Sequence, residues 1–304
     1  MFKRILLFFA MNALVILMIT LILNVLHLRP YLSSYGMDLS SLALFCLIWG
    51  MVGALISLGL SRIMAKWMMG VQRIDPNTQD PELREVLAMV HRLAKQAHLP
   101  ALPEVGVYRS NEVNAFATGP SRARSLVAVS TGLLQRMKSA DIEAVLAHEV
   151  SHIANGDMVT MTLLQGVVNA FVMFLARILA YAFSGLGRSN RQENGSYMSY
   201  ILFVYLFEIV FMILGSLLIA AYSRFREYRA DAGGAQLAGK ESMISALQTL
   251  RVFQEVHDKQ PENPAMAAFK ISHSGKRGWL ALFSTHPPLE ARIERLQISG
   301  QISG

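Results

Sequence analysis

Four long apolar segments are the feature that most limits what this chain of 304 residues can fold into. They cover residues 5–26, 39–60, 159–183 and 200–222. Each holds roughly the 20 residues that a helix needs to cross the hydrocarbon core of a bilayer. His27 and Arg29 follow the first segment without the small-residue cleavage site of a signal peptide, so we expect this segment to stay as an anchor.

The last two apolar segments each contain an ionisable residue, Arg177 in the third and Glu208 in the fourth. Such residues are costly inside a membrane unless they face other helices or a wet cavity, so we expect these two to pair with one another. The alternative is that the third and fourth segments are buried helices of a soluble part. Residues 184–199 between them are rich in Gly, Ser, Asn and Arg, which predicts a flexible loop.

The composition supports a membrane protein and argues against other classes. Hydrophobic residues make up 53% of the chain and charged residues only 16%, which excludes a disordered protein and is unlike an ordinary soluble one. The net charge of +7 comes from basic residues that flank the apolar segments, with no basic patch interleaved with aromatics, so no nucleic-acid partner is expected. The single cysteine, Cys46, can form neither an intramolecular disulfide nor a cysteine metal site.

The basic flanks also predict the orientation in the membrane. Lysine and arginine precede the first segment and follow the second and fourth, at Lys3, Arg4, Arg62, Lys66, Arg224, Arg226 and Arg229. Because such flanks favour the cytoplasmic side, residues 61–158 and 223–304 should both face the cytoplasm and form the two parts of one domain. Residues 1–60 are then an N-terminal transmembrane hairpin, and residues 159–222 a second pair of spans.

The soluble parts are predicted to combine helices with a small sheet. Apolar residues at helical spacing predict an amphipathic helix over residues 81–98. Short strands are predicted over 103–108, 114–118 and 125–130. A further helix should begin at Ser139, whose hydroxyl would cap the first turn together with Glu143. Residues 254–277, polar and with two prolines, predict a loop with short helical pieces.

That helix carries a His-Glu-Val-Ser-His pattern at residues 148–152. Residues four apart lie on one helix face, so His148 and His152 can reach the same metal ion. Glu149 lies beside the first histidine, where its carboxylate could accept a proton from the attacking water and pass it to the leaving amine. Two unrelated histidines are the alternative, but apolar neighbours on both sides indicate a packed helix.

A third metal ligand is expected after the fourth apolar segment, at the start of another helix. Glu227 is the candidate ligand, and Asp231 is the candidate acceptor for an imidazole N–H. The alternative for this pair is an exposed, salt-bridged turn. Two spans separate His152 from Glu227, and an even number returns the chain to the same side of the membrane, as a shared site requires.

Several motifs together resemble the HtpX family of bacterial membrane zinc proteases, whose relatives include the CAAX prenyl proteases and mitochondrial inner-membrane quality-control peptidases. The similarity covers nearly the whole chain, and its motifs are residues 147–157, 114–119, 226–231 and 285–288. It implies an α+β membrane protein: a mostly helical, gluzincin-type zinc protease domain with a small β-sheet, plus about four transmembrane helices. It also implies one Zn²⁺ per chain, held by His148, His152 and Glu227, with Glu149 as general base.

The resemblance further implies a multi-pass protein of the bacterial inner membrane that degrades misfolded or damaged membrane proteins under stress. Expected partners are such substrates and the lipid bilayer, with a second copy of the chain or another quality-control protease as further candidates. Substrate would add to the strand that holds Asn114, Ala115, Phe116 and Ala117. These residues could instead end a strand and fill the core, which we favour for Phe116. His286 is either a donor to the developing oxyanion or an ordinary loop histidine.

Two other functions remain open on the sequence. In a site-2-type intramembrane metalloprotease the helix of the His pair would lie in the bilayer, which Asp141, Glu143, Asn155 and Asp157 around the motif disfavour. A transporter or non-catalytic scaffold would use the ion for stability alone. A closed structural zinc site usually has a fourth protein ligand, so the three ligands favour an enzyme.

Overall fold

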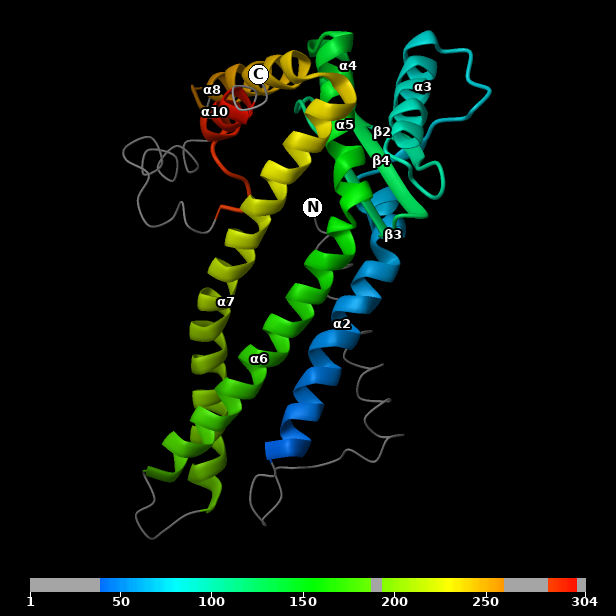
Figure 1. Cartoon of the computed structure of the whole chain (residues 1–304). Helices are drawn as coiled ribbons and strands as arrows, with labels where there is room; N and C mark the ends of the chain where they lie inside the picture. The colour runs from blue at the N-terminus through cyan, green and yellow to red at the C-terminus, as the bar shows by residue number, and fades with distance from the viewer. Residues whose placement is uncertain (1–38, 187–192, 260–283, 300–304) are drawn as a thin grey trace. The chain divides into compact units, whose positions relative to one another are not determined.

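The computed structural model describes residues 39–186, 193–259 and 284–299 (Figure 1). The predicted span over residues 5–26 lies outside the described residues. Two compact units make up the described chain. One contains the residues up to Leu58 together with Thr160–Ile219, and the other contains Gly59–Val159 and the residues from Ala220 onward.

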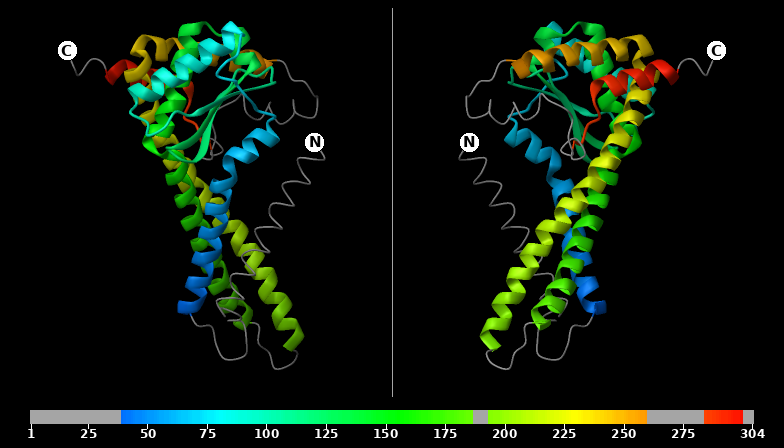
Figure 2. Two further views of the ribbon diagram at one scale, coloured as in Figure 1. Left: turned by 90° about the vertical axis from the view of Figure 1, so that its right-hand side faces the viewer. Right: turned by 90° about the vertical axis from the view of Figure 1, so that its left-hand side faces the viewer.

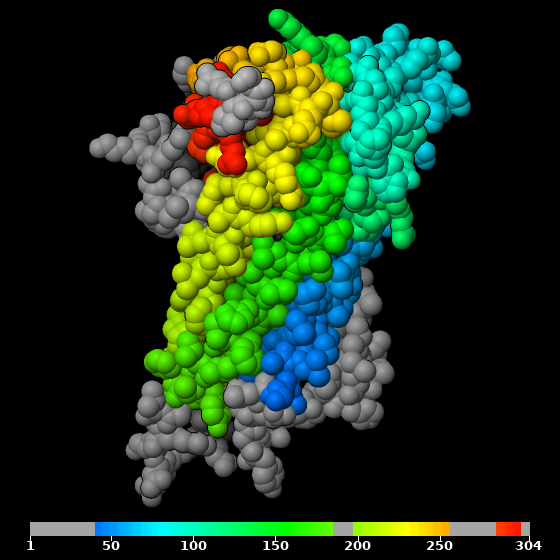
Figure 3. Space-filling view, in the orientation of Figure 1, coloured from blue at the N-terminus to red at the C-terminus, as the bar shows by residue number. Residues whose placement is uncertain are grey.

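Three described helices are long and apolar enough to cross a membrane, by length and composition. They are α2 (Leu39–Met68), α6 (Asp157–Leu186) and α7 (Glu193–Ala238). The first unit holds residues 39–58 of α2, 160–186 of α6 and 193–219 of α7. In this unit α2 and α6 lie side by side, with their atoms in direct contact in the space-filling view (Figure 3). A Cβ on Gly50 would lie only 2.6 Å from the carbonyl oxygen of Gly166, so glycine permits this approach.

The predicted pairing of the two intramembrane charges is confirmed. Arg177 Nη1 donates to Glu208 Oε1 over 2.8 Å, which links α6 to α7. The Arg177 guanidinium also lies 5.9 Å from the ring centroid of Phe45 on α2. The predicted loop over 184–199 is too long, because α6 continues to Leu186 and α7 begins at Glu193, leaving residues 187–192 outside the described part.

The second unit contains a four-stranded sheet in the order β1-β2-β4-β3. Its strands are β1 (Gln72–Arg73), β2 (Glu104–Tyr108), β3 (Ala115–Ser121) and β4 (Arg124–Ser130). β2 and β4 pair in parallel, whereas β1 and β3 pair antiparallel to their neighbours. The three predicted strands are confirmed. The two residues of β1 are too few to show an alternating pattern, so the sequence did not predict this strand.

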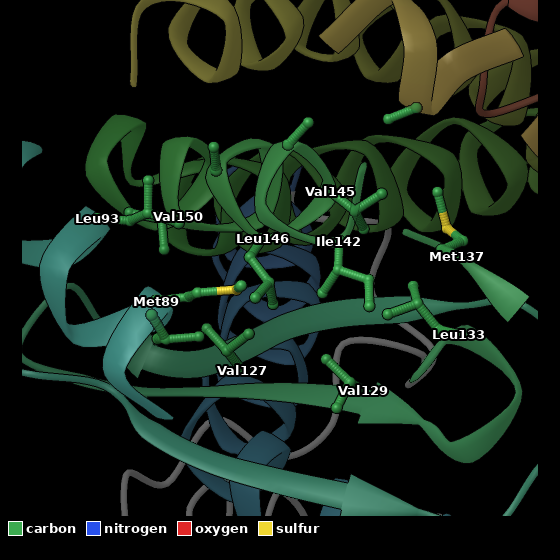
Figure 4. Packing of buried hydrophobic residues seen from close by; sticks show 14 of the residues in the cluster. Met89, Leu93, Val127, Val129, Leu133, Met137, Ile142, Val145, Leu146 and Val150 are labelled. Carbon is green, nitrogen blue, oxygen red and sulfur yellow. The ribbon is translucent and has the colours of Figure 1, made fainter. Parts of the chain in front are cut away.

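Helices form the core of this unit together with the sheet, with α5 packed on the sheet and α8 packed on α5 (Figure 2). They are α3 (Pro81–Gln96), α4 (Thr131–Arg136), α5 (Ser139–Asn155), α8 (Lys240–Lys259) and α10 (Leu289–Ser299). Figure 4 shows Ile142 and Leu146 pointing from α5 onto Val127 and Val129 of β4. The packing holds α5 rigidly against the sheet, and with it the His-Glu-Val-Ser-His residues. The predicted fold class, mostly helical with a small sheet, is confirmed.

One local prediction is wrong, and the start of a predicted loop is shifted. Ser139 does not cap its helix: its hydroxyl donates to Glu85 Oε1 over 2.6 Å, and the capping position is Lys138, which has no side-chain capping bond. The Ser139 hydroxyl therefore binds a residue of α3 in place of the first turn of its own helix. Residues 254–259 are the last part of α8 and not loop, while residues 260–277 lie outside the described part.

Candidate active site and metal centre

The site begins with two imidazoles on α5, one helical turn apart. His148 and His152 are both buried, and their Nε2 atoms lie 3.2 Å from one another. Their rings meet edge to face at 86°. Gly156, in the left-handed region at φ 71°, ends α5 one helical turn after His152. The i, i+4 spacing on a packed helix therefore directs both rings to the same point, as expected from the sequence.

Glu227 completes the group from α7. Its side chain is 1% exposed, and its carboxylate oxygens lie 3.5 Å from His148 Nε2 and 3.3 Å from His152 Nε2. The sequence analysis expected a new helix to start here, which is wrong. α7 runs without a break from Glu193 to Ala238. The alternative of an exposed salt-bridged turn is wrong as well, since both Glu227 and Asp231 are buried.

Two glycines allow α7 to lie close enough to α5 for this contact. A Cβ on Gly234 would lie 3.1 Å from the backbone nitrogen of His148. A Cβ on Gly233 would lie 2.7 Å from Ser151 Oγ. Larger side chains at these positions would push α7, and with it Glu227, away from the two histidines.

The geometry of the three side chains fits a tetrahedrally bound metal ion. Ligands about 2.0–2.1 Å from such an ion lie about 3.3 Å from each other, and the separations of 3.2, 3.3 and 3.5 Å agree with this. Both oxygens of Glu227 are buried, and the described residues give them no hydrogen bond of ordinary geometry. A buried carboxylate facing two imidazole nitrogens is a donor set suited to a divalent cation.

Carboxylates hold the other nitrogen of each imidazole. His148 Nδ1 lies 3.0 Å from Asp231 Oδ1, and His152 Nδ1 lies 2.7 Å from Asp157 Oδ2. An imidazole that donates its Nδ1–H to a carboxylate keeps its Nε2 lone pair free for a metal. Asp231 thus lies where the sequence analysis expected it. Asp157 had been noted only as a charge beside the motif, and its contact with His152 was not predicted.

Two arginines complete the surroundings, and the sequence analysis assigned neither to the site. Arg292 on α10 holds Asp231 through Nε at 2.8 Å and Nη2 at 2.5 Å. Arg229 on α7 forms an ion pair with Asp157. Arg229 had been given as a basic flank and as part of the motif at 226–231, without a role at the site, although its position two residues after Glu227 was a usable signal. Arg292 lies 61 residues from Asp231 with no motif spacing to mark it.

The charges around the histidines change their acidity. Burial disfavours the imidazolium form of His152, but the nearby carboxylates of Asp157 and Glu227 outweigh this effect and raise its pKa to about 9. For His148 burial is likewise outweighed, by Asp231 and Glu227, and its pKa is also raised. In the metal-free protein His152 is therefore in its imidazolium form at neutral pH.

The remaining predicted residues surround this centre. Glu149 is half-buried on α5 beside His148. His286 Nδ1 lies 2.9 Å from Glu227 Oε2, while the His286 side chain is 63% exposed. The chain thus brings His286 from the segment before α10 to the same group as the histidines of α5.

The predicted substrate strand is the outer strand of the sheet. β3 pairs with β4 alone among the described strands, and it also packs against α5. Asn114 is exposed and comes just before β3, whereas Ala115 and Ala117 are half-buried. The ring of Phe116 lies 5.6 Å from that of Tyr108 and packs on a small buried cluster, in agreement with the core-filling role favoured for it.

Comparisons with known proteins agree with this architecture. The model of Peptidase family M48 matches residues 80–299. The Protease HtpX homolog of Bacillus velezensis is 50% identical over 98% of this chain and 99% of its own length. The Protease HtpX homolog of Bacillus subtilis is 49% identical, again over 98% of this chain and 99% of its own.

The fold is also similar to a solved structure. The crystal structure of S. mikatae Ste24p matches with a TM-score of 0.64 over 97% of this chain and 64% of that chain, at 18% identity, so the likeness concerns the fold alone. The resemblance found in the sequence motifs is confirmed by the family match and by the near full-length relatives. The chain belongs to peptidase family M48 and is a membrane-bound metalloprotease.

Proposed function

We propose that the chain is a zinc-dependent endopeptidase of the bacterial inner membrane that degrades misfolded or damaged membrane proteins. The observation that carries this proposal is the buried group of His148, His152 and Glu227, whose separations suit one tetrahedral ion. Two imidazoles and one carboxylate are the ligands of several catalytic zinc sites, which keep a fourth position for water or substrate.

His148 and His152 would hold the ion through Nε2, and Glu227 through a carboxylate oxygen. When bound, Zn²⁺ supplies Lewis-acid chemistry, which polarises the scissile carbonyl and makes water a stronger nucleophile near neutral pH. Asp231 and Asp157 keep the Nδ1 protons on the two imidazoles, so that the rings stay in the orientation that ligation requires.

Glu149 is the proposed general base. Its carboxylate accepts the proton of the attacking water and then donates it to the nitrogen of the leaving amine. His286 is the proposed donor to the oxygen of the scissile carbonyl, where negative charge develops. Its contact with Glu227 and its exposed face support this role, because the ring lies at the centre and still reaches solvent.

The outer edge of β3 is the proposed binding site for an extended substrate. A substrate strand would pair with the backbone of Ala115 and Ala117 through main-chain hydrogen bonds, which give affinity with little dependence on side chains. The packing of β3 against α5 supports this assignment, because a strand bound there would run close to the helix of the His pair. Loose recognition suits a protease whose substrates share misfolding and not a sequence.

The surroundings in the cell are part of the proposal. The basic flanks of the apolar segments favour an active site on the cytoplasmic side. Damaged membrane proteins would then reach it from the bilayer, and a second copy of the chain or another quality-control protease could act with it. α5 is not among the described helices suited to span a membrane, which disfavours a site-2-type protease with the His pair in the bilayer.

Metal analysis and a cleavage assay test the proposal together. The protein is purified in detergent with a chelator, supplied with Zn²⁺, and mixed with casein or an unfolded membrane protein. We expect one zinc per chain and cleavage by the wild type, and one zinc without cleavage by Glu149→Gln. A Glu149→Gln protein that still cleaves would refute the role of Glu149. A zinc-loaded wild type with no cleavage of either substrate would favour the scaffold.

A further inference from the structure

The second histidine of the metal group depends on a turn between two helices. Gly156 ends α5 at φ 71°, and Asp157 begins α6 immediately afterward. This turn brings the Asp157 carboxylate back to His152, with 2.7 Å between Oδ2 and Nδ1. Asp157 is completely buried, so its negative charge needs compensation inside the protein.

Arg229 supplies that compensation from α7. Its Nη2 donates to Asp157 Oδ1, the oxygen that does not face His152. Among the described residues Arg229 is the arginine paired with Asp157. One carboxylate thus joins a permanently charged guanidinium to a metal-ligating imidazole, and each partner has its own oxygen.

The other histidine has a similar arrangement. His148 faces Asp231, and Arg292 holds Asp231 with two nitrogens. The two arginines differ in burial. Arg292 is buried, whereas the Arg229 side chain is 42% exposed. Arg292 also lies 3.8 Å from Glu227, so a change there disturbs a proposed metal ligand directly, whereas the ion pair of Arg229 is with Asp157, which makes Arg229 suitable for experiment.

We propose that Arg229 is a positioning residue that acts through Asp157 on His152 and thereby sets the affinity of the metal centre. Arg229 fixes the carboxylate of Asp157, and the carboxylate fixes the His152 ring in the tautomer with the proton on Nδ1. The Nε2 lone pair then points at the group formed with His148 and Glu227. This inference rests on the proposed metal site of those three residues.

Metal affinity, measured without catalysis, tests the proposal. All variants are made in the Glu149→Gln protein, and Zn²⁺ affinity is determined by competition with a chromogenic chelator. We expect Asp157→Asn to lose about 10 to 100-fold in affinity, the usual effect of removing such a partner. Arg229→Ala should lose about tenfold, and Arg229→Lys should recover most of that loss because it keeps the charge.

The matched control is Arg92→Ala. Arg92 is also exposed and pairs with Glu143 on α5, 2.6 Å away, but it does not touch a histidine. Its loss should leave the zinc affinity unchanged. The visible spectrum of the Co²⁺ form gives a second readout, because a reoriented His152 changes the ligand field. We expect a changed spectrum for Arg229→Ala and an unchanged one for Arg92→Ala.

The outcomes separate the two proposals. If the parent Glu149→Gln protein binds no Zn²⁺, the metal centre itself is refuted, and Arg229 with it. If the parent binds zinc and Arg229→Ala matches it in affinity and spectrum, the positioning role alone is wrong. Equal losses in Arg229→Ala and Arg92→Ala would likewise overturn that role, since they would reflect general destabilisation.

Discussion

At the scale of single residues, the site consists of buried charges that compensate one another. Asp157, Asp231, Glu227 and Arg292 are all buried, at or next to the two histidines. Charges removed from water are tolerated only when they are paired, so removing one member exposes the cost of burying its partner. Metal binding and stability should therefore respond together to changes at these positions.

The pair of Asp231 and Arg292 allows this to be measured. Asp231→Ala removes the acceptor of His148 Nδ1, so Zn²⁺ affinity should fall roughly 10 to 100-fold. It also removes the carboxylate that accepts two hydrogen bonds from the buried Arg292 guanidinium and leaves that guanidinium with Glu227 Oε2 at 3.8 Å, which should lower the metal-free stability by about 3–5 kcal/mol. The double variant Asp231→Ala/Arg292→Met should regain part of this stability in thermal unfolding, but not the affinity. A double variant less stable than Asp231→Ala would contradict this account of the pair.

Zinc affinity should depend on pH. Because the pKa of His152 is about 9 in the metal-free protein, the metal must displace a proton below that pH. We expect the affinity, measured with chelator-buffered Zn²⁺, to rise about tenfold per pH unit for each displaced proton and to level off near pH 9. A constant affinity between pH 6.5 and 8.5 would show that His152 is already neutral.

The same pKa predicts the opposite trend for the metal-free protein. The pKa of His152 is higher in the folded chain than its ordinary value of 6.5, so the folded state binds the extra proton. The stability that this gives is complete below about pH 6.5 and is lost as the pH rises through about 9. Melting temperatures should therefore fall with pH without metal, and this fall should be smaller in His152→Gln, where His148 is the remaining histidine with a raised pKa.

At the scale of helices and strands, close contacts between elements position the site. Gly233 and Gly234 let α7 approach α5, and the end of α2 is fixed to β2 because Arg62 and Lys66 both pair with Glu104. Within the first unit, glycines at the contact of α2 and α6 have the same function. Small residues at such contacts let helix backbones pack closely in a membrane, where no hydrophobic effect drives helices together.

A pair of alanine substitutions on α2 tests the helix contact. A Cβ at Gly50 would lie 2.6 Å from the Gly166 carbonyl oxygen and 2.7 Å from the Ala170 nitrogen, whereas Gly59 has open space around it. Gly50→Ala should destabilise the protein by about 1–3 kcal/mol through overpacking. Gly59→Ala should be neutral or stabilising, because alanine favours helix. Thermal unfolding in detergent measures both, and equal shifts would show that the contact is not tight.

At the scale of the whole molecule, the order of the segments decides how the site can form. The chain leaves the second unit after Val159 and returns to it at Ala220, so α6 and α7 separate the two histidines from Glu227 in sequence. A site made from both parts requires them to lie on one side of the membrane. The positions of basic residues predict that this side is the cytoplasm.

Cysteine labelling tests this orientation. In a Cys46→Ala background, single cysteines replace the exposed Gln79 and Gln297, and a third replaces Ser33 in the predicted external loop. A membrane-impermeant maleimide added to intact cells should label only the cysteine at position 33. The other two should react once the membrane is permeabilised. Labelling of position 79 in intact cells would reverse the orientation.

Local patterns in the sequence were enough to determine several parts of this protein. The apolar segments define the long helices, since about 20 apolar residues in succession are stable as a membrane helix. The shared helix face of His148 and His152, four residues apart, likewise follows from the repeat of the helical backbone. These features depend on neighbours along the chain, so the sequence alone predicts them.

The tertiary structure decided the contacts between distant residues. Asp157 meets Arg229 across 72 residues, and Arg292 meets Asp231 across 61, and no spacing rule marks such pairs. Ser139 shows the same limit. The local pattern predicts that its hydroxyl caps α5, but the hydroxyl donates to Glu85 on α3 instead. A buried charge takes whichever partner the packing brings to it, so which partner that is depends on the complete fold.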